Sequence, residues 1–213
     1  MIYSLAEITR EVRIAIDQNM TSEQLIVTGD IETLSLEDII RSKVVEAVRR
    51  VESVAAVRFL EAGHNFGDAV YWGELESGWV LLPEDFMRLI AFRMSDWERT
   101  VYAAISVSDP KYAKQSSRYK GIRGNPQKPV CAIVNRAEGR ALEFYSCKSK
   151  DAYVARATYV PYPSIDEETD SIDISKKCFT AVVYTVAALV LNTYGEADKA
   201  SAMVELAKSI LQQ

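Results

Sequence analysis

Residues 129–147 read PVCAIVNRAEGRALEFYSC, and they predict a β-hairpin in the middle of the chain. Two segments rich in apolar residues, 129–135 and 141–147, flank the turn sequence AEGR at 137–140. Apolar runs on both sides of a glycine-containing turn are typical of paired antiparallel strands. Outward from this hairpin, the same reasoning predicts strands at 69–74 and 79–82 around a turn at 76–78, at 89–94 and at 152–159.

Helices are predicted on both sides of this β region. Ser4 and Glu7 form a Ser-x-x-Glu capping box at the start of a helix over 5–18, and Ser35 begins a longer amphipathic helix over 36–60. Near the C-terminus, two further helices are predicted at 175–192 and 196–211, with Gly195 as the C-terminal cap of the first. A short strand is predicted at 24–28.

The order of helices, then strands, then a helical hairpin predicts an α+β fold. We expect residues 1–62 and 164–213 to form one helical bundle that includes the C-terminal hairpin. Residues 63–163 are then a β-rich insertion with antiparallel hairpins and a long basic loop at about 108–128. Residues 164–173 are predicted to be an acidic linker.

Composition excludes several classes of protein. The net charge of −5 and the pI of about 5.1 argue against a chain coated by nucleic acid, which usually requires a basic face. The chain has three cysteines, an odd number, and no Cys-x-x-Cys pair. A disulfide scaffold is therefore not expected, and we expect the protein in a reducing compartment. The most apolar stretch, 178–191, is too short to cross a bilayer, and the N-terminus lacks the pattern of a signal peptide.

The sequence contains no recognisable catalytic, cofactor or metal motif. His64 is the one histidine, and it reads as an ordinary loop residue because no nearby Ser or Cys has the context of a nucleophile. The glycine pair Gly121 and Gly124 lacks the Gly-Lys-Ser/Thr ending of a phosphate loop. Glu84 and Asp85 look like acids in the first turn of a helix. We therefore predict no enzyme activity, no cofactor and no metal.

Two charged segments are candidate interaction sites. The basic loop has six cations without an intervening acid, and Tyr112 and Tyr119 lie among them. It could bind nucleic acid through its cations and tyrosines, or it could simply be a solvated loop. Its cations are Lys111, Lys114, Arg118, Lys120, Arg123 and Lys128.

The predicted linker is the acidic counterpart of that loop. An intermediate hypothesis is that the basic loop of one subunit meets the acidic linker of the next, head to tail, because repeated heterologous contacts can close into a ring. Such contacts would weaken with added salt. The linker's acids are Asp166, Glu167, Glu168, Asp170 and Asp173.

Four aromatic residues gather around the first predicted hairpin: Tyr71, Trp72, Trp79 and Trp97. Most are expected to pack in a core, with one or two exposed. An interface anchor is the alternative for an exposed one.

The run LPEDFMRL at 82–89, followed by MSDWER at 94–99, resembles the LPxDFxRLxxxxxxxW pattern of neck proteins of tailed bacteriophages. The end of the chain is similar to the C-terminal helical hairpin of head–tail connector (adaptor) proteins, including ring proteins of podoviruses and crAss-like phages. It has Tyr162-Pro163, an acidic spacer, an apolar helix, YGEADKA at 194–200 and a last helix. The resemblance covers about half of the chain.

This resemblance implies a virion structural protein assembled in the host cytoplasm and located in the neck, at the head–tail interface. It implies a homo-oligomeric, dodecameric ring bound beneath the portal protein, which extends the DNA channel without specific DNA binding and offers a platform for tail or further neck proteins. The terminal hairpin is the implied portal-docking element, with Met203, Leu206, Ile210 and Leu211 as its candidate residues. No membrane partner is expected.

Two other hypotheses remain open. The first is a nucleic-acid-binding accessory protein that uses the basic loop, which predicts salt-dependent retention of duplex DNA. The second is a small enzyme without a familiar motif, which predicts a deep pocket with perturbed titratable groups.

Overall fold

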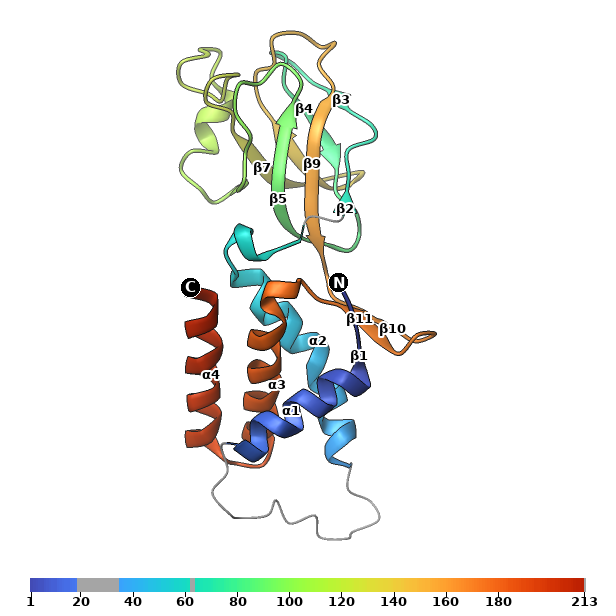
Figure 1. The fold of residues 1–213 in the computed structure, drawn as a ribbon. Coiled ribbons are helices and arrows are strands. Elements are labelled where there is room, and N and C mark those ends of the chain that lie inside the picture. The colour runs from blue at the N-terminus through green and yellow to red at the C-terminus, as the bar shows by residue number, and fades with distance from the viewer. Residues whose placement is uncertain (19–34, 62–63, 213) are drawn as a thin grey trace. The chain divides into compact units, whose positions relative to one another are not determined.

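The computed structural model describes residues 1–18, 35–61 and 64–212, and the chain divides into two compact units. The helical unit comprises Met1–Glu61 and Pro163–Gln213. The β unit, Ala62–Tyr162, is inserted between the second and third helices of the helical unit. Helices and antiparallel sheets in one chain confirm the α+β class, and the C-terminal helical hairpin is present (Figure 1).

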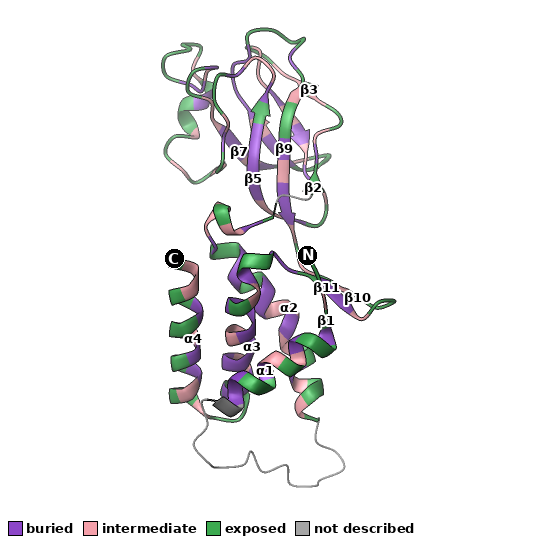
Figure 2. Cartoon of the chain, viewed as in Figure 1, coloured by how far each residue is buried: buried purple, intermediate pink, exposed green. Residues whose placement is uncertain are grey.

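The helical unit is organised around one buried helix. Helix α3 (Phe179–Thr193) contacts α1 (Leu5–Gln18), α2 (Leu36–Val54) and α4 (Ala197–Gln212). Its apolar residues are buried around most of its circumference, and Figure 2 shows it mainly in the colour of buried residues. The apolar stretch of the sequence is thus the centre of the helical core.

Local signals account for the ends of these helices. Ser4 Oγ accepts from Glu7 N at 3.1 Å at the start of α1, and Ser35 and Asp38 form a complete capping box on α2. Gly195 follows α3 in the left-handed region, with φ of +80°, and its nitrogen donates to Asn192 O at 3.2 Å. The predicted C-terminal cap is confirmed.

The second helix is shorter than expected. The sequence predicts a helix to residue 60, whereas α2 ends at Val54 and Ala55 is extended. A short 3-10 turn, η1 (Val57–Phe59), follows and brings Glu61 to the start of η3 (Lys176–Cys178), where Glu61 N donates to Ser175 Oγ at 3.2 Å. A contact distant in sequence therefore ends the helix.

The acidic segment 164–173 is not a linker. It forms a hairpin of β10 (Ile165–Asp166) and β11 (Ser171–Asp173), and β11 also pairs with β1 (Ile2–Ser4). The register places Tyr3 opposite Ile172. The prediction was wrong because the stabilising strand lies at the other end of the chain. The strand predicted at 24–28 lies outside the described residues.

The β unit contains two sheets with a shared core. One sheet has the order β2 (His64–Asn65), β9 (Val154–Pro161) and β5 (Phe86–Met94). The other sheet has five strands, in the order β3 (Tyr71–Trp72), β4 (Gly78–Leu81), β8 (Gly139–Phe144), β7 (Cys131–Arg136) and β6 (Ile105–Ser106). All pairs are antiparallel except β6 with β7.

Aromatic side chains join the two sheets. Phe92 of β5 stacks on Phe144 of β8 with ring centroids 5.9 Å apart, and Trp97 meets Phe92 edge to face at 5.8 Å. The predicted strand at 89–94 is confirmed and begins at Phe86. Glu84 and Asp85 belong to the turn before β5 and not to a helix, because Phe86 N donates to Pro83 O at 3.1 Å and the chain then enters the sheet.

Candidate functional site

The basic loop is a folded segment with its own hydrogen bonds, and we call residues 108–128 the basic segment. Gln115 is buried at its centre, where its Nε2 donates to Lys111 O at 2.8 Å and its Oε1 accepts from Gly124 N at 2.8 Å. Asn125 Nδ2 donates to Lys120 O at 2.8 Å. These bonds fix the backbone on which the cations are mounted.

Arg123 has a structural position within this segment. Its side chain is only 1% exposed, and its guanidinium donates to Ser117 O at 3.4 Å and to Leu75 O at 3.2 Å. The carboxylate of Glu76 lies 3.9 Å away. Arg123 is therefore unavailable to an outside partner, contrary to the expectation for it.

The remaining cations of the basic segment are exposed: Lys111, Lys114, Arg118, Lys120 and Lys128. Of the two tyrosines, Tyr119 is 67% exposed between Arg118 and Lys120, whereas Tyr112 is half-buried and donates to Glu143 at 3.4 Å. The segment thus presents cations and one tyrosine to solvent.

Most acids of the β10–β11 hairpin already have partners in the helical unit. Asp170 pairs with Arg41 at 2.5 Å, and Asp173 accepts from the nitrogen of Met1. Asp166 accepts from Thr169 Oγ1 at 2.8 Å within the turn, which lowers the pKa of this carboxyl. Glu167 and Glu168 remain exposed at the tip of the hairpin. The acidic surface open to a partner is therefore smaller than the sequence suggests.

The terminal hairpin is similarly divided. Met203 is 1% exposed and belongs to the core of the helical unit, so it cannot dock on a partner without unpacking. Leu206 is 39% exposed, and Ile210 and Leu211 are partly buried. These three remain the candidate docking residues.

Charge is segregated between the two units. The helical unit has 19 acidic and 11 basic residues, a formal net charge of −8. The β unit has 11 acidic and 14 basic residues, a formal net charge of +3. The modest net charge of the whole chain conceals this opposition.

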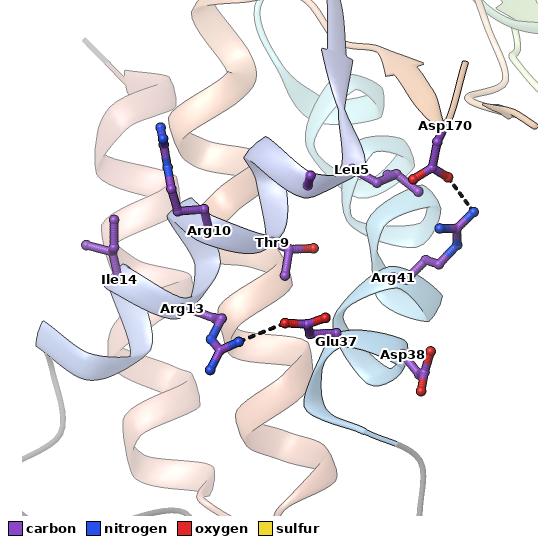
Figure 3. Close-up of a pocket in the computed structure, with 10 residues that line it drawn as sticks. Leu5, Thr9, Arg10, Arg13, Ile14, Glu37, Asp38, Arg41 and Asp170 are labelled. Carbon is purple, nitrogen blue, oxygen red and sulfur yellow. Dashed lines mark hydrogen bonds and ion pairs between the residues drawn. The ribbon is translucent and has the colours of Figure 1, made fainter. Parts of the chain in front are cut away.

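A groove of about 570 Å³ lies on the helical unit between α1 and α2 (Figure 3). Ile14 is among its apolar lining residues, and two ion pairs cross it, Arg13 with Glu37 at 2.8 Å and Arg41 with Asp170 at 2.5 Å. The two ion pairs therefore add no net charge to the groove.

The cysteines are buried free thiols with little nucleophilic character. Burial is the main cause that raises the pKa of all three thiols. The pKa values of Cys147 and Cys178 rise to about 12, and the pKa of Cys131 rises well above its usual value. In residues 1–18, 35–61 and 64–212, no group of three or more His, Cys, Asp or Glu side chains could hold a metal ion. Among the same residues, no helix is long and apolar enough to cross a membrane.

One pair of cations was missed by sequence reasoning. Arg93 of β5 lies directly opposite Arg156 of β9, and both are exposed. No local signal could reveal this pair, because the β5–β9 register contains shifts and joins residues far apart in the chain.

The sequence matches no protein-family model, and no curated protein is recognisably similar to it.

Proposed function

We propose that this chain is a structural neck protein of a tailed-bacteriophage virion, which forms a ring between the portal and the tail. The observation that carries the proposal is the opposite net charge of the two units, −8 and +3. Opposed charges on the two units favour a head-to-tail contact between the β unit of one copy and the helical unit of the next. Heterologous contacts of this kind form closed rings when the rotation between subunits closes.

The proposed contact joins the basic segment of one subunit to the tip of the β10–β11 hairpin of the next. Lys111, Lys114 and Arg118 are exposed cations with no ion pair within the described part of the chain. Glu167 and Glu168 are exposed acids on the other unit. Exposed charge pairs add little affinity singly, so we expect them to select the partner surface and its register.

In this proposal the terminal hairpin docks on the portal through Leu206, Ile210 and Leu211. Their partial exposure on α4, which packs mainly on α3, supports that role. The ring would extend the DNA channel and provide an attachment platform for tail proteins. Both functions are structural.

A charge exchange tests the ring contact. One variant carries Lys111→Glu, Lys114→Glu and Arg118→Glu, a second carries Glu167→Lys and Glu168→Lys, and a third carries all five changes. Sedimentation at low and high salt, with and without the portal protein from the same genome, measures assembly. We expect the first two variants to lose assembly and the combined variant to regain it, because like charges then oppose each other only in the partial exchanges.

Two results would count against the proposal. Assembly unchanged by salt and by the partial exchanges would remove the charge-based contact. A metabolic operon around the gene, without portal or capsid genes, would contradict the role in a virion neck.

A further inference from the structure

Arg93 and Arg156 form a cross-strand pair of like charges on the β5–β9 ladder. They are register partners in an antiparallel pair, and both side chains are exposed. Residues directly opposite in such a pair have Cβ atoms about 4.5–5.5 Å apart, and like charges there destabilise the sheet. Figure 1 shows β5 and β9 side by side.

Nothing within the described residues neutralises this pair. Arg93 Nε donates to the backbone oxygen of Trp97 at 3.1 Å, and no carboxylate lies within ion-pair distance of either guanidinium in the described part of the chain. Two other arginines of the β unit have partners within it, since Arg136 pairs with Glu143 and Arg140 donates to Phe86 O at 3.1 Å. The Arg93–Arg156 pair is therefore uncompensated charge.

Hydrogen bonds connect the end of β5 to two segments that carry further cations. Trp97 O accepts from Arg93, and the nitrogen of the next residue, Glu98, donates to Pro126 O at 2.9 Å, which joins this segment to the end of the basic segment with exposed Lys128. Glu98 is itself exposed, and its carboxylate accepts from Gln127 Nε2 at 3.0 Å. Asp96, which follows β5, accepts from Lys148 N. This segment carries the exposed cations Lys148 and Lys150 together with the exposed acid Asp151.

An exposed aromatic ring completes this surface. Ser95 N donates to Tyr153 O at 2.8 Å and Tyr153 N donates to Ser95 Oγ at 3.2 Å, which pairs Tyr153 with the first residue after β5, two positions beyond Arg93. The side chain of Tyr153 is among the most exposed apolar groups, at 68%. Figure 2 shows exposed stretches on both β5 and β9.

We propose that this surface, which we call the arginine face, binds the phosphodiester backbone of nucleic acid. It comprises Arg93, Arg156, Lys128, Lys148, Lys150 and Tyr153. A guanidinium presents a planar fork of donors that matches phosphate oxygens, and adjacent phosphates can neutralise adjacent arginines. Duplex DNA carries one negative charge per about 1.7 Å of axis, a density that suits several closely spaced cations. The contact reads phosphates, so it is independent of sequence.

The arginine face shares the basic segment with the proposed ring contact only through Lys128, whereas the ring contact uses Lys111, Lys114 and Arg118. Binding of nucleic acid by the arginine face does not require a ring. Either proposal can therefore fail without the other.

Salt-dependent binding of the full-length chain to a fluorescent 30-base-pair duplex tests the proposal. Each phosphate contact contributes about 0.9 to the slope of log affinity against log salt concentration. The variant Arg93→Gln with Arg156→Gln should lower that slope by about 1.8, and fold normally because it relieves repulsion. The matched control, Arg10→Gln with Arg49→Gln, removes the same charge from exposed positions of the helical unit and should leave the slope unchanged.

An unchanged slope in the Arg93/Arg156 variant would overturn the proposal. An equal decrease in the control would also overturn it, because net charge would then explain the binding. Sedimentation of the same variant provides the third readout. If it lost self-association while its DNA-binding slope stayed unchanged, the pair would be a contact between subunits and the proposal would be wrong.

Discussion

Glu52 of α2 accepts a hydrogen bond from the backbone nitrogen of Ser175 at 2.8 Å, although the two residues are 123 positions apart. Both are buried, with exposed fractions of 4% and 6%. The bond joins the last turns of α2 to the start of η3, and so connects the two chain segments that flank the inserted β unit. A buried carboxylate in this position links folding of the helical unit to pH.

Glu52→Gln should make the stability of the helical unit less dependent on pH. Burial is the main cause that raises the pKa of Glu52 above 4.5, so the folded state holds its proton to higher pH than the unfolded state does. The contribution of this group is therefore fully favourable below pH 4.5 and is lost as pH rises through the folded-state pKa. The glutamine oxygen can still accept from Ser175 N without a buried charge.

Urea unfolding of both proteins between pH 4 and pH 7 measures this effect. The stability difference should shift in favour of Glu52→Gln as pH rises. Glu52→Ala is the control that removes the acceptor, and it should cost about 1–3 kcal/mol because Ser175 N–H is left buried without that partner. Parallel pH profiles for wild type and Glu52→Gln would contradict the assignment.

Arg123→Met should disorder the basic segment without unfolding the sheets. The guanidinium of Arg123 holds Ser117 and Leu75 through their carbonyl oxygens, and each lost bond to a charged donor is worth about 1.5–3 kcal/mol. Hydrogen exchange should increase over 108–128 and remain slow in β7 and β8. Arg118→Met, at an exposed position, is the matched control, and it should leave hydrogen exchange unchanged both over 108–128 and in β7 and β8.

Gly78→Ala should destabilise the β unit. A Cβ at Gly78 would overlap the backbone oxygen of Tyr71 and lie 2.8 Å from Cζ of Phe144, so β3 and the aromatic core would both have to move. Overpacking of this kind typically costs about 1–3 kcal/mol. Gly121→Ala is the control, because a Cβ there meets nothing within 4 Å. Thermal unfolding should separate the two variants, and equal melting temperatures would contradict the packing at Gly78.

Arg156→Thr should stabilise the β unit at low salt. The change removes one partner of the like-charge pair with Arg93 and introduces a β-branched residue that favours strands. We expect a gain of about 0.2–1 kcal/mol that shrinks as salt screens the repulsion. Thermal unfolding at two ionic strengths checks it, and Ala155→Thr, at the adjacent exposed position, controls for strand propensity.

Helix positions were the most predictable part of this fold. The limits of α1 follow from the capping pair Ser4 and Glu7 and from local apolar spacing, and Gly195 ends α3 because it can adopt a left-handed backbone. The hairpin of β7 and β8 was equally predictable, since its turn and both strands lie within 19 consecutive residues. All of these signals act over short distances along the chain.

The candidate surfaces were predicted less completely. The sequence identified the cations of the basic segment, but it could not separate buried Arg123 from exposed Arg118, because burial depends on Leu75 and Glu76 from another part of the β unit. Similarly, the acids of 164–173 were recognised, while the ion pair of Asp170 with Arg41 was not. Composition reveals charge, and only packing reveals which charges remain available.

The sequence alone therefore determined the α+β class, the helices with their caps and the C-terminal hairpin, because hydrophobic periodicity and capping are local properties. Tertiary structure decided the pairing of β1 with β11, the end of α2 at Val54 and the opposition of Arg93 to Arg156. Each of these depends on residues that are distant in the chain. Strand register is set by the partner strand and the core behind it, so a pair such as Arg93 and Arg156 exists only once the sheet has formed.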